Sequence, residues 1–189
     1  MIREQVGAMW KDTRLVWRLQ RGRVDALRQI YDKYKLDLLK LAIFLTGDVS
    51  HSEDVVQDVF LKLAESYDRI SDHGNVKNFL ITCLVNRIRT LRRDRQRHQA
   101  APCDGRATEK ASVRGPEQWA VANEQMQRLS EALAGLPLEQ REVVTLHFEA
   151  GLGFRQIAGI QNASVNTVQG RYRYGMEKLR SLLNSEVDT

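Results

Sequence analysis

Apolar residues recur every three or four positions along most of this chain, and that spacing predicts amphipathic α-helices. No stretch alternates apolar and polar residues as a half-buried strand would, and only three of the 189 residues are prolines. The sequence therefore predicts an all-α fold. A stretch without periodicity divides the apolar patterns into two groups, so we expect two small helical domains joined by a flexible linker.

The first group of patterns, between residues 13 and 98, predicts a short helix or turn at 13–20 and three longer helices. The first long helix is expected to follow Gly22 and to end at Gly47, since glycine readily adopts the left-handed backbone found after helices. The second begins at residues 50–53, Ser-His-Ser-Glu, which fit a capping box with the first serine as N-cap. The third leads into a run of arginines.

The second long helix has an acidic and amide face opposite its apolar one. The polar face consists of Glu53, Asp54, Gln57 and Asp58. The buried side is predicted to comprise Val55, Val56, Val59, Phe60 and Leu63. Such a polar face is either simply solvated or a surface that pairs with basic residues of a partner.

The second group of patterns follows a stretch of Ala, Pro, Gly, Ser, Thr and mixed charges that predicts the linker. Helical spacing then resumes, with Pro137 near the start of one helix and Gly151 at its end. In chain order the predicted organisation is an N-terminal extension (1–12), a first domain (13–98), the linker (99–116), a second domain (117–184) and a tail (185–189).

Residues 153–174 predict a helix-turn-helix, in which a tight turn joins a short helix to a second one. Asn162 tolerates the strained turn, and Ser164 can cap the second helix. Apolar spacing on that helix leaves a polar and cationic set for solvent or a ligand: Asn166, Thr167, Gln169, Gly170, Arg171, Arg173 and Tyr174. A helix-turn-helix presents such groups to the DNA major groove, whereas an ordinary pair of packed helices leaves them solvated.

The charge distribution favours a polyanionic partner. The chain has a formal net charge of +5. Between residues 85 and 98, six arginines stand against one aspartate, so this segment alone carries as much positive charge as the whole chain.

The sequence lacks the features of metalloproteins, enzymes and membrane proteins. Cys83 and Cys103 lack metal-ligand spacing, and no Asp, Glu or His constellation suits catalysis, so we expect no metal, no cofactor and no enzymatic activity. Charged residues such as Lys11 and Asp12 interrupt the N-terminal apolar residues, and no apolar segment is long enough to span a membrane. These features predict a cytoplasmic protein with reduced thiols and no membrane insertion.

Four short motifs occur in a fixed order along the chain. Residues 54–60 read Asp-Val-Val-Gln-Asp-Val-Phe, and 78–80 read Asn-Phe-Leu ahead of the arginine run. Residues 136–143 read Leu-Pro-Leu-Glu-Gln-Arg-Glu-Val, and 167–171 read Thr-Val-Gln-Gly-Arg. Together they resemble the extracytoplasmic-function (ECF) group of bacterial sigma factors in the sigma-70 family. The resemblance spans about 13–184, in two blocks joined by the linker.

The resemblance implies a non-catalytic subunit that binds core RNA polymerase, directs it to promoters and helps to open the duplex. In the family, residues at the positions of Asp54, Gln57 and Asp58 bind the coiled-coil clamp of the polymerase β′ subunit. The β flap is a second implied contact on the polymerase. An anti-sigma protein that covers the polymerase-binding surfaces is a further implied partner.

The resemblance also implies that the helix around the arginine run holds the minus-10 element. The residues placed near bases of the non-template strand are Asn75, Asn78, Phe79 and Asn86. The residues expected to neutralise phosphates are Arg87, Arg89, Arg92 and Arg93. For Phe79 the spacing also fits core packing, and both interpretations stay open.

In the helix-turn-helix, the resemblance places Gln169, Gly170, Arg173 and Tyr174 near base edges of the minus-35 element. Asn166, Thr167 and Arg171 are placed nearer the phosphates, and Arg155 at a helix start is suited to meet one. The family commonly has a basic residue where Gln169 stands and a serine where Gly170 stands. These departures predict that promoter choice differs from the family's usual minus-35 sequence.

A stand-alone helix-turn-helix regulator is the alternative function. Such a protein would ordinarily dimerise to read two half-sites. It would leave both the acidic helix face and the arginine-flanked helix without a role.

Overall fold

The structure is a computed structural model that describes residues 14–66, 76–100 and 123–185. Every regular element in those ranges is a helix, which confirms the all-α fold. After a short helix at 14–20, the described helices are α2 (Val24–Thr46), α3 (Val49–Ser66), α4 (Val76–Ala100), α5 (Asn123–Ala134), α6 (Leu138–Phe148), α7 (Phe154–Gln161) and α8 (Val165–Ser185). Asn75, Cys103, the N-terminal extension and most of the predicted linker lie outside the described residues.

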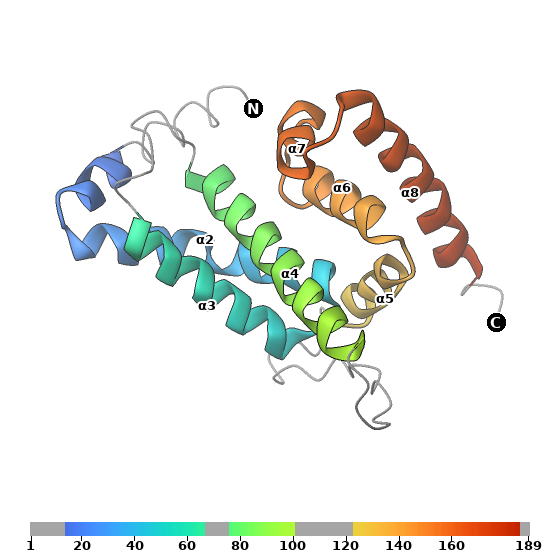
Figure 1. Ribbon diagram of the computed structural model, residues 1–189, viewed down its shortest axis with the longest axis horizontal. Helices are drawn as coiled ribbons and strands as arrows, with labels where there is room; N and C mark the ends of the chain where they lie inside the picture. The colour runs from blue at the N-terminus through green and yellow to red at the C-terminus, as the bar shows by residue number, and fades with distance from the viewer. Residues whose placement is uncertain (1–13, 67–75, 101–122, 186–189) are drawn as a thin grey trace.

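Helices α2, α3 and α4 pack on one another and form the N-terminal domain, comprising 14–66 and 76–100 (Figure 1). Their apolar faces meet in a core whose largest fully buried side chains include Ile30, Leu41, Leu63, Leu80 and Leu84. Gly47 follows α2 with a φ of 77°, the left-handed conformation that the sequence predicts for it.

The start of α3 differs from the predicted capping box. The helix begins at Val49, and the carboxylate of Asp48 accepts a hydrogen bond of 3.0 Å from the His51 backbone N–H. Burial alone would raise the pKa of Asp48, but hydrogen bonds from the His51 backbone and ring hold it below its usual value. Asp48 is therefore the N-cap, because a carboxylate gains most from the positive end of a helix. The prediction of Ser50 as N-cap is wrong.

Helices α5 to α8 form the C-terminal domain (123–185), and α7 and α8 make the predicted helix-turn-helix (Figure 1). Asn162 occupies the turn with a φ of 50°. The Oγ of Ser164 accepts a hydrogen bond of 3.1 Å from the Thr167 N–H, which confirms its predicted role as a cap. Ile157 of α7 and Val168 of α8 are fully buried and fix the crossing of the two helices.

The two domains are in contact, with α2 packed against α5 and α6. The ring of Phe44 on α2 is only 4% exposed and belongs to an apolar cluster formed by the C-terminal domain, which includes Leu133, Leu136 and Val144. A second cluster joins the core of the N-terminal domain to Val143 and other C-terminal residues. The domains thus share buried apolar surface as well as a linker.

Candidate nucleic-acid and partner interfaces

Arg87, expected to neutralise a phosphate, forms an ion pair with Asp58. Its Nε donates to the Asp58 carboxylate at 2.7 Å, and both side chains are about 40% exposed. Asp58 thus lies on the side of α3 that faces α4. Gln57 lies on a different side of α3, where it lines a groove between α3 and α2. An ion pair this exposed contributes little to stability, so phosphate or a partner's charge can replace it.

The Arg87–Asp58 pair lines a hollow of about 230 Å³ between α3 and α4. Asn86, whose side chain is exposed, and Cys83 line the same hollow. Burial raises the pKa of the Cys83 thiol, so at neutral pH the thiol is protonated and unreactive.

Arg89 reaches across the domain boundary instead of pointing to solvent. Its guanidinium donates two hydrogen bonds to Glu142 of α6, of which the Nε bond is 2.9 Å, and one of 2.8 Å to the Ile160 carbonyl. The Glu142 side chain is only 2% exposed and that of Arg89 is 26% exposed. This ion pair is therefore largely shielded from water and from dissolved ions.

Arg92 and Arg141 share one acceptor at the carboxyl end of α2. The Leu45 carbonyl accepts a hydrogen bond of 2.6 Å from Arg92 of α4 and one of 3.2 Å from Arg141 of α6. Burial lowers the pKa of both arginines, and that of Arg141 falls to about 10. Both guanidiniums stay charged at neutral pH and complement the negative end of the α2 dipole.

The remaining predicted minus-10 residues differ in exposure. Arg93 is exposed and donates long hydrogen bonds only to its own helix, at 3.4 and 3.5 Å. Asn78 and Phe79 are partly buried, and Phe79 packs against the core of the N-terminal domain. Arg93 and Asn86 are thus the predicted minus-10 residues that α4 exposes most fully, while Phe79 packs against the core without being fully buried.

The predicted minus-35 residues gather on the outer side of the helix-turn-helix. Those with exposed side chains are Arg155, Asn166, Thr167, Gln169, Arg173 and Tyr174. The Arg173 guanidinium lies 5.0 Å from the centroid of the Tyr174 ring, and both side chains are exposed. Arg171 differs, because it donates a hydrogen bond of 2.8 Å to Gln161 of α7.

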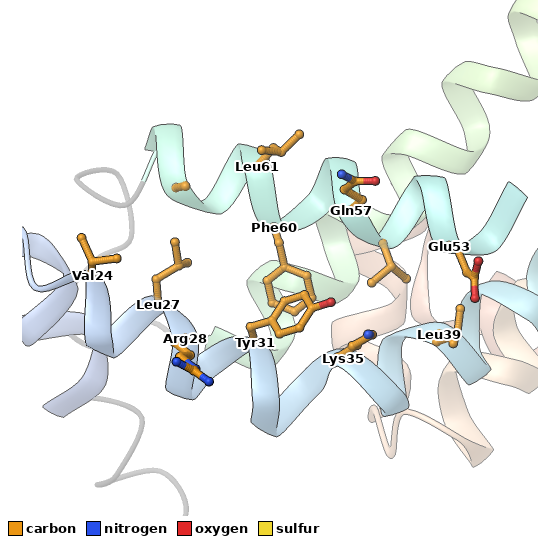
Figure 2. A pocket seen from close by; sticks show the side chains of 12 residues that line it. Val24, Leu27, Arg28, Tyr31, Lys35, Leu39, Glu53, Gln57, Phe60 and Leu61 are labelled. Atoms are coloured by element: carbon orange, nitrogen blue, oxygen red, sulfur yellow. The ribbon is translucent and has the colours of Figure 1, made fainter. Parts of the chain in front are cut away.

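A groove of about 700 Å³ lies between α2 and α3. Figure 2 shows the rings of Tyr31 and Phe60 in its middle, where their centroids are 4.8 Å apart. Glu53 and Gln57 line it from α3, while Arg28 and Lys35 line it from α2. An apolar middle between polar walls suits an amphipathic helix of a partner.

Within the described residues, no group of His, Cys, Asp and Glu is arranged to hold a metal ion. None of the helices described is long and apolar enough to cross a membrane.

Comparison with known proteins assigns both domains. A family model described as Sigma-70 region 2 matches residues 30–98, and one described as Sigma-70, region 4, matches 126–179. The ECF RNA polymerase sigma factor SigL of Mycobacterium tuberculosis is 30% identical over 159 residues, which cover 83% of this chain and 88% of SigL. This chain belongs to the ECF RNA polymerase sigma factors. The ECF sigma factor EcfG of Rhodopseudomonas palustris is likewise 30% identical and covers 84% of the chain.

Solved structures support the same fold. CnrH, solved with the cytosolic domain of CnrY, superposes with a TM-score of 0.70 at 22% identity and covers 92% of this sigma factor. The sigma factor RpoE of Bartonella quintana, solved with the anti-sigma factor NepR, gives a TM-score of 0.63 at 24% identity and covers 83%. As an alternative sigma factor, the protein binds core RNA polymerase, directs it to promoters and assists promoter opening.

The motifs did not identify the residues that join the two domains of this sigma factor. Arg141 and Glu142 stand in one of those motifs, which gives them no such role, and Phe44 belongs to none of the motifs. One signal was present in the sequence: Arg141 stands three positions before Val144 and Glu142 four positions before Leu146, so both charges share a helix face with apolar residues.

Proposed function

We propose that the α2–α3 groove and the exposed face of α3 form the surface that binds the polymerase β′ clamp. Asp54 and Gln57 are exposed on α3, and Gln57 lines the groove beside the Tyr31 and Phe60 rings. Apolar contacts in the groove would supply affinity, while the carboxylate and amide would fix the register of a basic partner helix. Asp58 takes part after its pair with Arg87 opens.

In this proposal the outer side of α4 binds along the opened strand of the minus-10 element. Arg93 and Asn86 are already exposed, and Arg87 becomes available when Asp58 binds the polymerase. Asn75, Asn78 and Phe79 retain their proposed places near the bases. Arg89 and Arg92 contact phosphate only after their present hydrogen bonds break.

The outer side of the helix-turn-helix reads the minus-35 element. Gln169, Arg173 and Tyr174 face the base edges, and Gly170 lets the backbone of α8 approach the DNA closely. The phosphate contacts assigned to this domain are Arg155, Asn166, Thr167 and Arg171. The single observation that carries the proposal is that α3 and α8 expose their polar residues on separate surfaces, one for each partner.

The regulatory setting is proposed by analogy with the relatives. RpoE is solved with an anti-sigma factor, so an anti-sigma protein is a proposed partner of this chain as well. The β flap is proposed to contact the C-terminal domain. We place the protein's action in the cytoplasm with the polymerase, and assign it no catalytic activity of its own. A stand-alone regulator is not favoured, because both sigma regions are present.

The polymerase surface is tested with a double variant, Asp54→Lys with Gln57→Lys. Like charges facing the basic clamp should weaken binding to core polymerase by at least about tenfold. Binding is measured by co-elution and by fluorescence anisotropy of labelled protein, with helical content checked by circular dichroism. Glu65→Lys, at another exposed acid of α3, is the matched control and should bind normally. Normal assembly of the double variant would exclude this face from the interface.

A further inference from the structure

A second cationic surface lies on the short helix at 14–20 and on the turn that follows it. Within residues 14–25, four arginines stand against one aspartate. These residues precede the Sigma-70 region 2 match, which begins at residue 30, and their arginines take no part in the surfaces described above. In Figure 1 the short helix lies on the side of the N-terminal domain where α4 begins, away from the arginine-rich carboxyl end of α4.

The short helix is amphipathic, and its packing fixes which side chains face outward. Val16 and Leu19 are buried in the core of the N-terminal domain, at 1% and 4% exposure. Arg14, Trp17 and Arg21 follow one another at steps of three and four positions, so they share the opposite side, and all three are exposed. Trp17 is 50% exposed, which is unusual for so large an apolar side chain.

The exposed tryptophan is surrounded by guanidinium groups. The Arg21 guanidinium lies 3.4 Å from the centroid of the Trp17 ring, a cation–π contact that holds the two groups together. Arg18 and Arg23 both form ion pairs with Asp25, the latter at 3.4 Å. One carboxylate cannot neutralise four arginines, so the surface around the indole keeps a net positive charge.

This combination suits a single-stranded nucleic acid. Proteins bind single strands by stacking unpaired bases on aromatic rings beside a cationic groove that holds the phosphates. A duplex keeps its bases stacked on one another and would offer Trp17 no base face. An acidic protein would pair with the arginines but would not need a planar aromatic group among them. Promoter opening supplies such a strand.

The position of the short helix indicates which part of the opened strand it can reach. The C-terminal domain, which is proposed to read the upstream element, follows the carboxyl end of α4 in the chain. A strand bound along α4 therefore has its upstream part at that end and its downstream part at the amino end. The short helix lies on the amino-end side (Figure 1).

We propose that Trp17, Arg14 and Arg21 bind the opened promoter strand just downstream of the minus-10 element, with a base stacked on the indole and phosphates on the two guanidiniums. The inference rests on the placement of the minus-10 strand along α4 proposed above. It adds a third DNA contact to the chain, one that depends on base stacking and tolerates different sequences.

The test compares the binding of full-length holoenzyme to two forked promoter templates. The single strand of the short template stops at the end of the minus-10 element, and that of the long template continues for about ten nucleotides. Trp17→Ala should weaken binding to the long template by about tenfold, the factor that one stacked base contributes, and leave the short template unchanged. Trp17→Phe, which keeps an aromatic ring, should retain most of the affinity. Leu36→Ala, at a 58% exposed leucine of α2, is the control and should change neither.

A spectroscopic signal reports the stacked base directly. 2-Aminopurine placed in turn at each downstream position of the long template should be quenched at the position that stacks on Trp17, and Trp17→Ala should restore its fluorescence. Arg14→Ala and Arg21→Ala should each reduce the slope of log affinity against log salt by about 0.7 on the long template. Arg180→Ala, at an exposed arginine near the end of α8, should not change that slope.

Equal affinity of the Trp17→Ala and unaltered holoenzymes for the long template would overturn the proposal. Weaker assembly of Trp17→Ala with core polymerase, without any change in the 2-aminopurine signal, would also overturn it, because the surface would then bind a protein. Failure of the α4 assignment would appear separately, as normal binding of an Arg93→Ala holoenzyme to the short template.

Discussion

At the scale of single residues, neighbouring arginines of α4 have different environments although the sequence presents them as one cationic run. Arg92 is held by the Leu45 carbonyl and Arg89 by Glu142, while Arg93 is exposed and bonds only to its own helix. Arg173 on α8 is exposed in the same way and lies beside the Tyr174 ring. These two exposed arginines therefore give the clearest test of base reading against phosphate binding.

Arg173→Ala should relax the preference at one minus-35 position, because a bidentate arginine contact to guanine is worth about 1–3 kcal/mol of discrimination. Arg93→Ala should instead weaken binding to all sequences and reduce the slope of log affinity against log salt by about 1. Both are measured by binding the holoenzyme to a set of promoter variants at several salt concentrations. Equal losses on every promoter from both substitutions would contradict the division into base readers and phosphate contacts.

Sequence pattern predicted which residues are polar and on which helix they lie, but not what holds them. The apolar spacing of α8 correctly left Asn166, Gln169 and Arg173 exposed. It could not show that Arg171 binds Gln161 or that Arg89 binds Glu142, since the latter pair is separated by 53 positions in the chain. Periodicity reports one helix at a time, whereas such contacts depend on how two domains pack.

At the scale of elements, α8 combines a half that we propose to read DNA with a half that packs on α6, and each half contains a glycine. Around Gly170 nothing lies within 4 Å of the position that a Cβ would take. At Gly175 a Cβ would lie 3.0 Å from the Val144 Cγ2 and 3.3 Å from the Gln140 Cβ. Gly175 therefore permits the close crossing of α6 and α8, while Gly170 has no such packing role.

Gly170→Ala should raise the free energy of unfolding by about 0.5–1 kcal/mol, because alanine loses less backbone entropy in a helix than glycine. Gly175→Ala has the same entropic gain but must displace α6, and overpacking of this kind costs about 1–3 kcal/mol. We expect it to be destabilising. Urea unfolding followed by circular dichroism measures both, and a stabilised Gly175→Ala variant would show that the crossing of α6 and α8 is looser than described.

The elements themselves were largely predictable, and their ends less so. Glycine and asparagine at helix ends were correctly identified because their left-handed conformations at Gly47 and Asn162 are local properties. The start of α3 was misplaced because Asp48 and Ser50 are both good N-caps, and the choice depends on the His51 contact to Asp48. Phe44 was not predicted because apolar spacing does not show that α2 also packs against the C-terminal domain.

At the scale of the whole molecule, the family models divide the chain into two domains, whereas the buried contacts join these domains into one packed unit. Sigma-70 region 2 and region 4 match separate blocks. One apolar cluster nevertheless contains residues of both domains. The other cluster consists of C-terminal residues together with Phe44 of the N-terminal domain. The sequence predicts two domains on a flexible linker but not their contact, because the charged and apolar residues that join them resemble ordinary helix positions.

A shared core has a thermodynamic consequence that calorimetry can measure. Since unfolding either domain exposes apolar surface on the other, the free protein should unfold in one cooperative transition, with equal calorimetric and van't Hoff enthalpies. Phe44→Ser removes the aromatic bridge, so the single transition should separate into two or broaden until the enthalpies differ. Phe148→Ser, which leaves the bridge intact, should retain one transition. Two transitions in the unaltered protein would show that the domains unfold independently and that their contacts contribute little to stability.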